Sequence, residues 1–367
     1  MEPEIKITPG YKNKLASYIF SLKGIRIFYA VLCTTAIVLI PVLFAYFDGN
    51  IDNSVLDVDV LDDYGSMAFY LIGFPAMLVT AILYANKFPE VLDRLKGNDI
   101  INVSDSEWNN FKLRANDIYS KWYYTNGPHF IALAITISLF FVFRNPNKHI
   151  WYSLETDEFI YLGGWAQLIV YYVTFYVFSL SLLNIVATYR ILEVLFSTNK
   201  LVVQPLHPDK CGGLAPLGAL SRTLIYGIIF LGIIVTLNVH FNYENFDREL
   251  DNPLQISIML GYLVMAYFIF FLPMHAAHKP MKQAKEEEMR LIHHYIAGIN
   301  KEIKKDFEEL RDIDSDALEN FHNAKEMYDI TSEMPVYPYN VKTVITFISS
   351  VFIPVLLYFL TRFLDSM

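Results

Sequence analysis

The sequence predicts an all-α, polytopic membrane protein with seven transmembrane helices, and its composition and hydropathy pattern support this fold class. Apolar residues make up 54% of the 367-residue chain and charged residues only 18%, below the roughly 25% of an average soluble protein. The apolar residues gather into stretches close to the roughly 20 residues that a helix needs to cross a bilayer. The expected spans are 25–47, 67–86, 129–143, 162–188, 223–240, 256–275 and 343–364.

The first stretch is too long and begins too late for a cleavable signal peptide, so we interpret it as the first span. The third stretch is the shortest. Between the second and third, residues 87–127 predict two amphipathic helices with a turn near Gly97, and Ser104 and Glu107 have the spacing of a capping box. We therefore divide the chain into membrane helices 1–276, a cytoplasmic helical region 277–342 and a last membrane helix 343–367.

The distribution of charge predicts the orientation. With a cytoplasmic N-terminus and an external C-terminus, 25 of the 29 basic residues lie in cytoplasmic segments, as the positive-inside rule requires. The outer segments then carry a formal charge of −10 and the inner segments +1. A negative outer field concentrates cations at the mouth of any pathway, although acidic loops also serve simply to keep a surface solvated.

The cytoplasmic region 277–342 contains an apolar seam. Its residues recur at alternating steps of three and four, close to the coiled-coil period. They are Met289, Ile292, Ile296, Ile299, Ile303, Phe307 and Leu310. The pattern predicts a helix that leaves the membrane with one apolar stripe, followed by a second helix capped near Asp316.

Catalytic chemistry has no visible basis in the sequence. No ionisable residue lies in mid-span, where charge is costly and marks function, and Gln167, Asn184 and Asn238 are the strongest polar groups there. Metalloprotease, acyl-transfer and nucleotide-hydrolysis motifs are absent. The histidines at 275, 278, 293 and 294 lack a third ligand at fixed spacing, so we expect no metal site, no cofactor and no enzyme activity.

The loop between the fourth and fifth spans is the most unusual local sequence. Prolines and glycines in residues 204–218 forbid a continuous helix. His207, Lys210, Gly212 and Gly213 have the character of an anion site, in which backbone N–H groups and a compact positive charge hold a phosphate. The alternative is a rigid elbow between two spans.

The last span carries a polar stripe at helical spacing. It consists of Thr343, Thr346, Ser350, Pro354, Leu357, Thr361 and Asp365. Around a symmetry axis this face would form hydroxyl rings, an apolar constriction at Leu357 and a cation-attracting ring at Asp365. Helix packing explains the same hydroxyls equally well, because Ser and Thr bond to the preceding turn or to a neighbouring helix.

Several known families share parts of this pattern. The His-Pro-Asp-Lys string resembles the tripeptide of J-domain co-chaperones, but the connection between the spans is too short for that module. Residues 204–218 and 335–354 resemble uncharacterised bacterial membrane proteins with His-Pro-Asp-basic-x-Gly-Gly-Leu between spans and a Pro-aromatic-Pro step before the last. The topology resembles insect odorant and gustatory receptor channels, without their aromatic signature in the last helix.

Size and organisation are also similar to the membrane effector of the Hailong anti-phage system. That resemblance implies a homotetrameric channel that is controlled by an oligonucleotide from a nucleotidyltransferase partner. The anion site is then expected among His207, Lys210, Gly212, Gly213, Lys279, Lys282, Lys285 and Arg290, although an inner charge of +1 departs from a strongly basic nucleic-acid surface.

These observations predict a homo-oligomeric, ligand-gated, cation-preferring channel of the bacterial inner membrane that responds to an anionic cytoplasmic ligand. A small-molecule transporter is the first alternative, and a membrane scaffold or sensor is the second.

Overall fold

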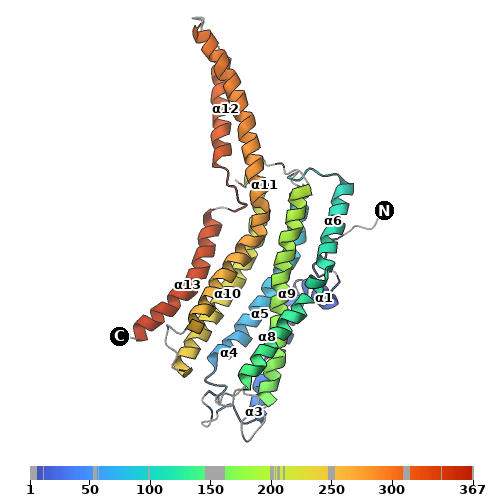
Figure 1. The fold of residues 1–367 in the computed structure, drawn as a ribbon, viewed down its shortest axis with the longest axis vertical. Coiled ribbons are helices and arrows are strands. Elements are labelled where there is room, and N and C mark those ends of the chain that lie inside the picture. The colour runs from blue at the N-terminus through green and yellow to red at the C-terminus, as the bar shows by residue number, and fades with distance from the viewer. Residues whose placement is uncertain are drawn as a thin grey trace.

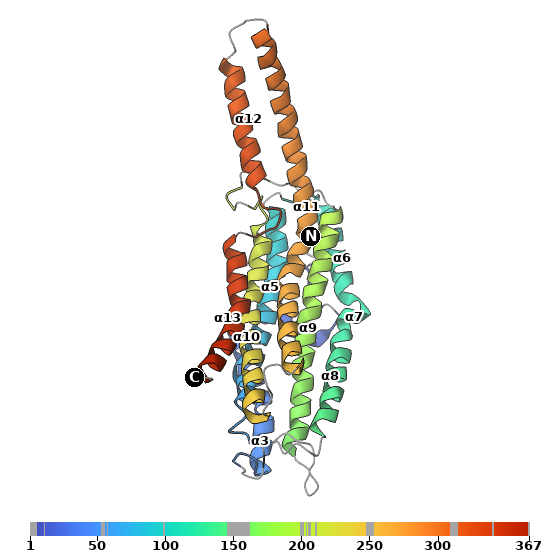
Figure 2. The same cartoon turned by 60° about the vertical axis from the view of Figure 1, so that its left-hand side comes forward.

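The computed structural model describes residues 6–10, 12–52, 56, 58–97, 100–144, 162–198, 202, 204, 207–209, 211–246, 253–308, 315–339 and 341–365. The described chain is all-α, as predicted. The helices form a long bundle from which one helical hairpin projects (Figure 1). Turning the molecule shows the hairpin standing clear of the bundle (Figure 2).

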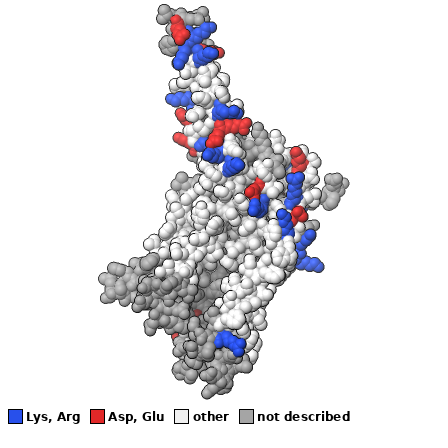
Figure 3. All heavy atoms as spheres, viewed as in Figure 1, with Lys and Arg blue, Asp and Glu red and all other residues white. Residues whose placement is uncertain are grey.

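Five helical segments among the described residues are long and apolar enough to cross a membrane. They are Ile25–Phe47, Tyr64–Gly97, Leu162–Ser197, Ala215–Leu237 and Ile256–Lys305. The protein is therefore a multi-pass membrane protein, and the prediction of seven spans is corrected to five. On the face seen in Figure 3, the described charged side chains gather on the hairpin and at the upper end of the bundle, while the middle is largely white.

The two remaining apolar stretches form shorter apolar helices, Gly127–Phe141 and Lys342–Ile353. The first belongs to α8 (Gly127–Phe143), whose 17 residues rise only about 26 Å at 1.5 Å per residue. The second is part of α13 (Val341–Asp365). α8 is therefore short for a hydrocarbon core of roughly 30 Å, whereas α13 has 25 residues but its described apolar stretch covers only Lys342–Ile353.

The first two spans are not regular helices. The first divides into α2 (Ile25–Val38) and α3 (Ile40–Phe47) at Leu39, because Pro41 has no N–H to continue the helical bonding. The second begins with α4 (Tyr64–Ala68) and a π-helical turn, η1 (Phe69–Gly73), before α5 (Phe74–Gly97). A π turn inside a helix is often found beside a functional site.

Short helices pack on the outside of α5 and α9. α1 (Lys14–Phe20) lies against α5, α6 (Asp105–Ser120) lies against α9, and α7 (Trp122–Thr125) leads into α8. The predicted capping box is confirmed: Glu107 N–H donates to the Ser104 hydroxyl, and Ser104 N–H donates to the Glu107 carboxylate at 2.8 Å. Trp108 and Phe111 of α6 are buried against α5 and α9 (Leu162–Thr198).

Four helices enclose the centre of the bundle. α5 packs against α10 (Ala215–Phe246), α10 against α11 (Pro253–Glu308) and α11 against α9, while α9 also touches α5. This order places α9 opposite α10. α8 and α3 both lie along α9, and α13 covers the outer side of α10.

The projecting hairpin is formed by α11 and α12 (Ser315–Glu333). α11 runs without interruption from the membrane into the hairpin, past Pro273 and Pro280, so the predicted boundary at 276/277 falls inside one helix. The seam is confirmed where it is described: Ile292 and Ile299 are buried, and α11 packs on α12 of the same chain. The side chains of Phe307 and Leu310 lie outside the described residues.

Candidate functional site: the junction between hairpin and membrane helices

The connector between α12 and α13, residues 334–339, packs on the side of α11. The Tyr337 ring stacks on the His278 ring with centroids 4.1 Å apart and planes 14° from parallel. Nδ1 of His278 lies 3.1 Å from the carbonyl oxygen of Val336 and donates to it. Two different contacts therefore hold the connector to one turn of α11.

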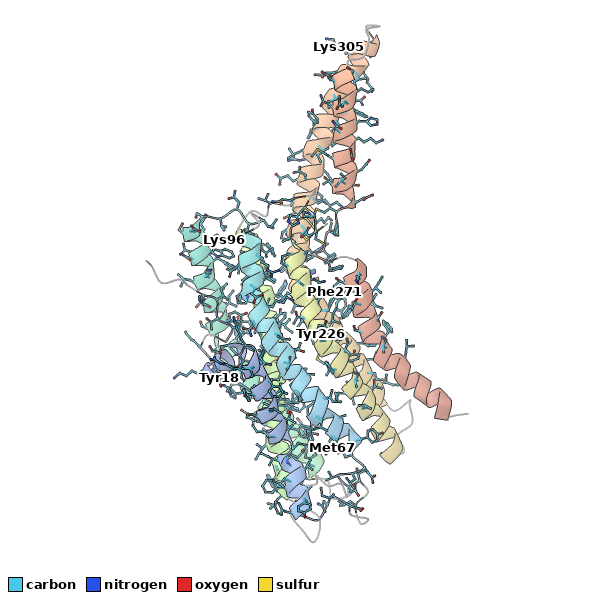
Figure 4. The ribbon with its side chains drawn as sticks, turned by 180° about the vertical axis from the view of Figure 1, so that it is seen from behind. Tyr18, Met67, Lys96, Tyr226, Phe271 and Lys305 are labelled. Carbon is cyan, nitrogen blue, oxygen red and sulfur yellow. The ribbon has the colours of Figure 1, made fainter. Side chains whose placement is uncertain are left out.

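An aromatic cluster fixes the start of α13. Tyr339 continues the stack from Tyr337 at 5.3 Å, and the Phe270 and Phe347 rings stack at 4.2 Å. Phe271 completes the cluster, 6.1 Å from Tyr339 and 5.4 Å from Phe347. Figure 4 shows Phe271 on α11 near the upper end of α13. α13 is thereby attached to α11 at the point where it leaves the connector.

The connector also lies against the first turn of α10. A Cβ built on Gly218 would overlap the Pro338 carbonyl oxygen, so only glycine permits this approach. The loop before α10 and the connector before α13 are therefore neighbours in space. Sequence reasoning did not predict that they meet.

Lys285 caps the C-terminal end of α12. Its Nζ donates to the carbonyl oxygens of Ser332 at 2.6 Å and Met334 at 2.7 Å. These carbonyls belong to the last turn of α12 and have no partner in their own helix, and a lysine near a helix C-terminus satisfies such groups. Lys285, predicted as a ligand contact, thus links the two arms of the hairpin.

Asp209 organises the loop before α10. Its Oδ1 accepts from the N–H groups of Cys211 at 2.8 Å and Gly213 at 3.0 Å, and its Oδ2 accepts from Ala215 N–H at 3.0 Å. The His207 ring lies 2.9 Å away. Partial burial acts to raise the pKa of Asp209, but these hydrogen bonds to its charged form outweigh it and lower the pKa.

The two glycines of this loop serve its shape. Gly212 and Gly213 have φ of +66° and +92°, a backbone conformation that other residues rarely adopt. A Cβ on Gly213 would also overlap Ile100. The N–H of Gly213, expected to meet an external anion, is bonded to Asp209. These observations favour the rigid elbow, which was the alternative at the sequence level.

The other predicted ligand residues are separated from that loop. Lys279, Lys282 and Arg290 are exposed on α11, and Lys282 lies 3.8 Å from Glu286. Their spacing places all three on one face of the helix. Lys210 lies outside the described residues.

The polar stripe of α13 is only partly described. Thr343 and Ser350 are buried, whereas Thr346 is exposed. The Ser350 hydroxyl donates to the Thr346 carbonyl at 2.6 Å, and the Thr346 hydroxyl donates to the Lys342 carbonyl at 2.9 Å. Both hydroxyls are thus satisfied within α13. The side chains of Pro354, Leu357, Thr361 and Asp365 lie outside the described part.

A basic group in the second half of α5 was missed at the sequence level. Lys87 is close enough to Arg94 and Arg222 for their charges to act on it, with Glu90 as the opposing charge. Arg222 belongs to α10, so the group bridges two helices. Only the fold brings these residues together; in the sequence they count simply as cytoplasmic positive charges.

No group of three His, Cys, Asp or Glu side chains within the described residues has the arrangement to hold a metal ion. No protein family model, curated protein or solved structure matches this chain.

Proposed function

We propose that the protein is a homo-oligomeric, gated, cation-preferring channel of the bacterial inner membrane, in which the α11–α12 hairpin is the cytoplasmic control element. The observation that carries this proposal is the double attachment of the connector. It is held to α11 by His278 and to α10 at Gly218, and it leads directly into α13. A displacement of the hairpin is therefore passed to the start of α13.

The outer face of α13 is the proposed contact with other subunits. Phe347 and Val351 pack inward with residues of α10 and α11, whereas Ile345, Ile348 and Phe352 are exposed. In this conformation Thr343 and Ser350 face the chain's own bundle. We interpret it as the closed state, from which rotation of α13 would turn the polar stripe toward a shared axis.

The proposed stimulus is an anionic ligand, with an oligonucleotide as the first candidate. Because Asp209 already accepts from the loop N–H groups, the proposed contacts are Lys279, Lys282 and Arg290 on the exposed face of α11. Phosphates bind such side chains through charge-assisted hydrogen bonds. A ligand bound there lies one to three turns from His278 and the connector.

Potassium and chloride flux from proteoliposomes tests this proposal. Tyr337→Ala removes the stack on His278 and should change basal potassium flux at least several-fold, while Tyr295→Ala, an exposed tyrosine on the same hairpin, should not. Absence of flux with wild-type protein under every ligand tried, together with a monomeric state in nanodiscs, would exclude the channel.

The ligand is tested separately with a set of short oligonucleotides. Combined Lys279→Glu, Lys282→Glu and Arg290→Glu substitutions should abolish binding, and binding to wild type should weaken with added salt. The matched control combines Lys301→Glu, Lys304→Glu and Lys325→Glu, which makes the same charge change at exposed positions elsewhere on the hairpin. Equal binding by both variants would remove this surface from the proposal.

A small-molecule transporter stays the second candidate, because a cavity lies among α5, α9, α10 and α11. A transporter would accumulate or exchange a solute at rates that saturate, whereas a channel passes ions down their gradient. The same proteoliposomes distinguish the two.

A further inference from the structure

The centre of the four-helix arrangement contains a cavity of about 100 Å³ that is partly open to its surroundings. It lies between α9 and α10, whose described residues make no extensive contact with each other. An apolar cavity of about 150 Å³ binds benzene, so this space has room for a single ring or a short aliphatic group.

Two close helix contacts keep one wall of the cavity in place. A Cβ on Gly227 of α10 would come within 2.9 Å of Thr80, and one on Gly73 would come within 2.9 Å of Ile234. Small residues let helices approach closely within a membrane. α5 and α10 are therefore locked together, and α9 is held apart from α10 by α5 and α11.

The lining is apolar except for a few groups. Phe178, Ile228 and Leu231 are typical of its walls. The Ser181 hydroxyl donates to the Val177 carbonyl of its own helix at 2.7 Å and so needs no ligand. One strongly polar side chain remains, which is that of Asn184.

Asn184 is only 6% exposed, and its Oδ1 has no hydrogen-bond partner among the described residues. Leaving a buried acceptor unpaired costs about 1–3 kcal/mol. In a membrane span no bulk water is available to repay that cost. An asparagine at this position is stable when something that enters the cavity donates a hydrogen bond to it.

We infer that this cavity binds an apolar small molecule that carries a hydroxyl or amide hydrogen-bond donor. The aliphatic or aromatic body would fill the space between Phe178 and Leu231, and the donor would bond to Asn184 Oδ1. Tyr84, which is 1% exposed and also lines the cavity, places a second polar group near the same end. This inference does not depend on the protein being a channel.

The test uses purified protein in nanodiscs and two photoreactive probes. One is a four-carbon alcohol with a diazirine on its chain, and the other is the same hydrocarbon without the hydroxyl. Adducts are mapped by mass spectrometry. The alcohol should label cavity residues such as Met77 in a saturable manner, and unlabelled butanol should compete with it.

Two variants make the result specific. Asn184→Leu keeps the volume and removes the acceptor, so it should weaken alcohol labelling about 5- to 10-fold, the equivalent of roughly one hydrogen bond, and leave hydrocarbon labelling unchanged. Ser181→Phe fills the space and should abolish labelling by both probes. Near-UV circular dichroism tests whether each variant is folded. If Asn184→Leu is not folded, the inference is tested by the loss of labelling in Ser181→Phe and by the difference between alcohol and hydrocarbon labelling of the wild type.

Three results would overturn the inference. One is alcohol labelling that does not saturate and spreads equally to the lipid-exposed Phe28 and Leu32 of α2. Another is equal alcohol labelling of wild type and folded Asn184→Leu. The third is the lack of any adduct in the cavity, which would mean that water alone satisfies Asn184.

Discussion

α11 is one continuous helix in two different environments, and its halves are stabilised differently. In the membrane half, Phe270, Met274, Ala277 and Met281 are fully buried against several helices. In the hairpin half, Ile292 and Ile299 lie where α11 packs against α12, and both keep slight exposure. The exposed side of the first half is apolar, as at Phe268, and that of the second is charged. The same helical period thus supports a multi-sided core below the junction and a single seam above it.

The largest expected effect lies in the membrane half. Phe270→Ala removes a fully buried ring and its stack on Phe347, and such truncations cost about 3–5 kcal/mol. Denaturant unfolding of the detergent-purified protein measures this cost. Phe268→Ala, two residues away and 56% exposed, should change stability by much less; equal losses from both variants would contradict the predicted difference between the two faces.

A smaller effect is expected in the hairpin. Ile299→Ala weakens the seam by about 2 kcal/mol, at the lower end of the range for such truncations, because a two-helix contact relaxes more readily. Hydrogen exchange should quicken in α12 and the upper part of α11 while α10 stays protected. Leu291→Ala, exposed on the same helix, is the control. Faster exchange throughout α10 would show that hairpin and bundle unfold as one unit.

Lys285→Met should cost about 1 kcal/mol locally, since it removes the donor for the carbonyls of Ser332 and Met334. Hydrogen exchange should increase in the last turn of α12. Lys282→Met on the same helix, whose partner is the neighbouring Glu286, should leave that turn unchanged. Protection that is the same in both variants would mean that the connector alone fixes the hairpin.

The smallest expected effect is a dependence on pH. The pKa of Asp209 is lower in the folded protein, so its contribution to stability is complete above its unfolded value of about 4 and is lost as the pH falls through the folded value. Asp209→Asn should therefore flatten the loss of stability as the pH falls below about 4. Asp329→Asn, on the exposed part of α12, should keep the wild-type profile; an unchanged profile in Asp209→Asn would contradict the assignment.

Local patterns of the sequence predicted local structure well. The capping box at Ser104 and the seam at Ile292 and Ile299 depend on residues within one or two turns, so spacing alone determines them. The apolar stretches located the helices, but spacing did not reveal that α8 is too short to qualify as a span. In α8 the composition is that of a membrane span, but the helix is shorter than a span requires.

The candidate site is formed by contacts between segments that are far apart in the sequence, and residue spacing does not predict such contacts. The sequence separated the 204–218 loop from the connector, and only the fold places Gly218 against Pro338. The same loop contained its own carboxylate: Asp209, inside the motif, takes the N–H groups that had been assigned to an external anion. An Asp three residues before a Gly-Gly pair is a signal for such a turn. Asn184 was noticed as polar, but not as the polar group of a cavity.

The contact between Gly218 and Pro338 also limits how this protein can change over time. Any side chain at position 218 would displace the connector, and a shifted connector would lose its place beside His278. A substitution in one segment therefore becomes acceptable only after the other has moved. Sequences that descend from this one should vary at the two segments together, and a chimera that exchanges only one of them should fail to accumulate in the membrane.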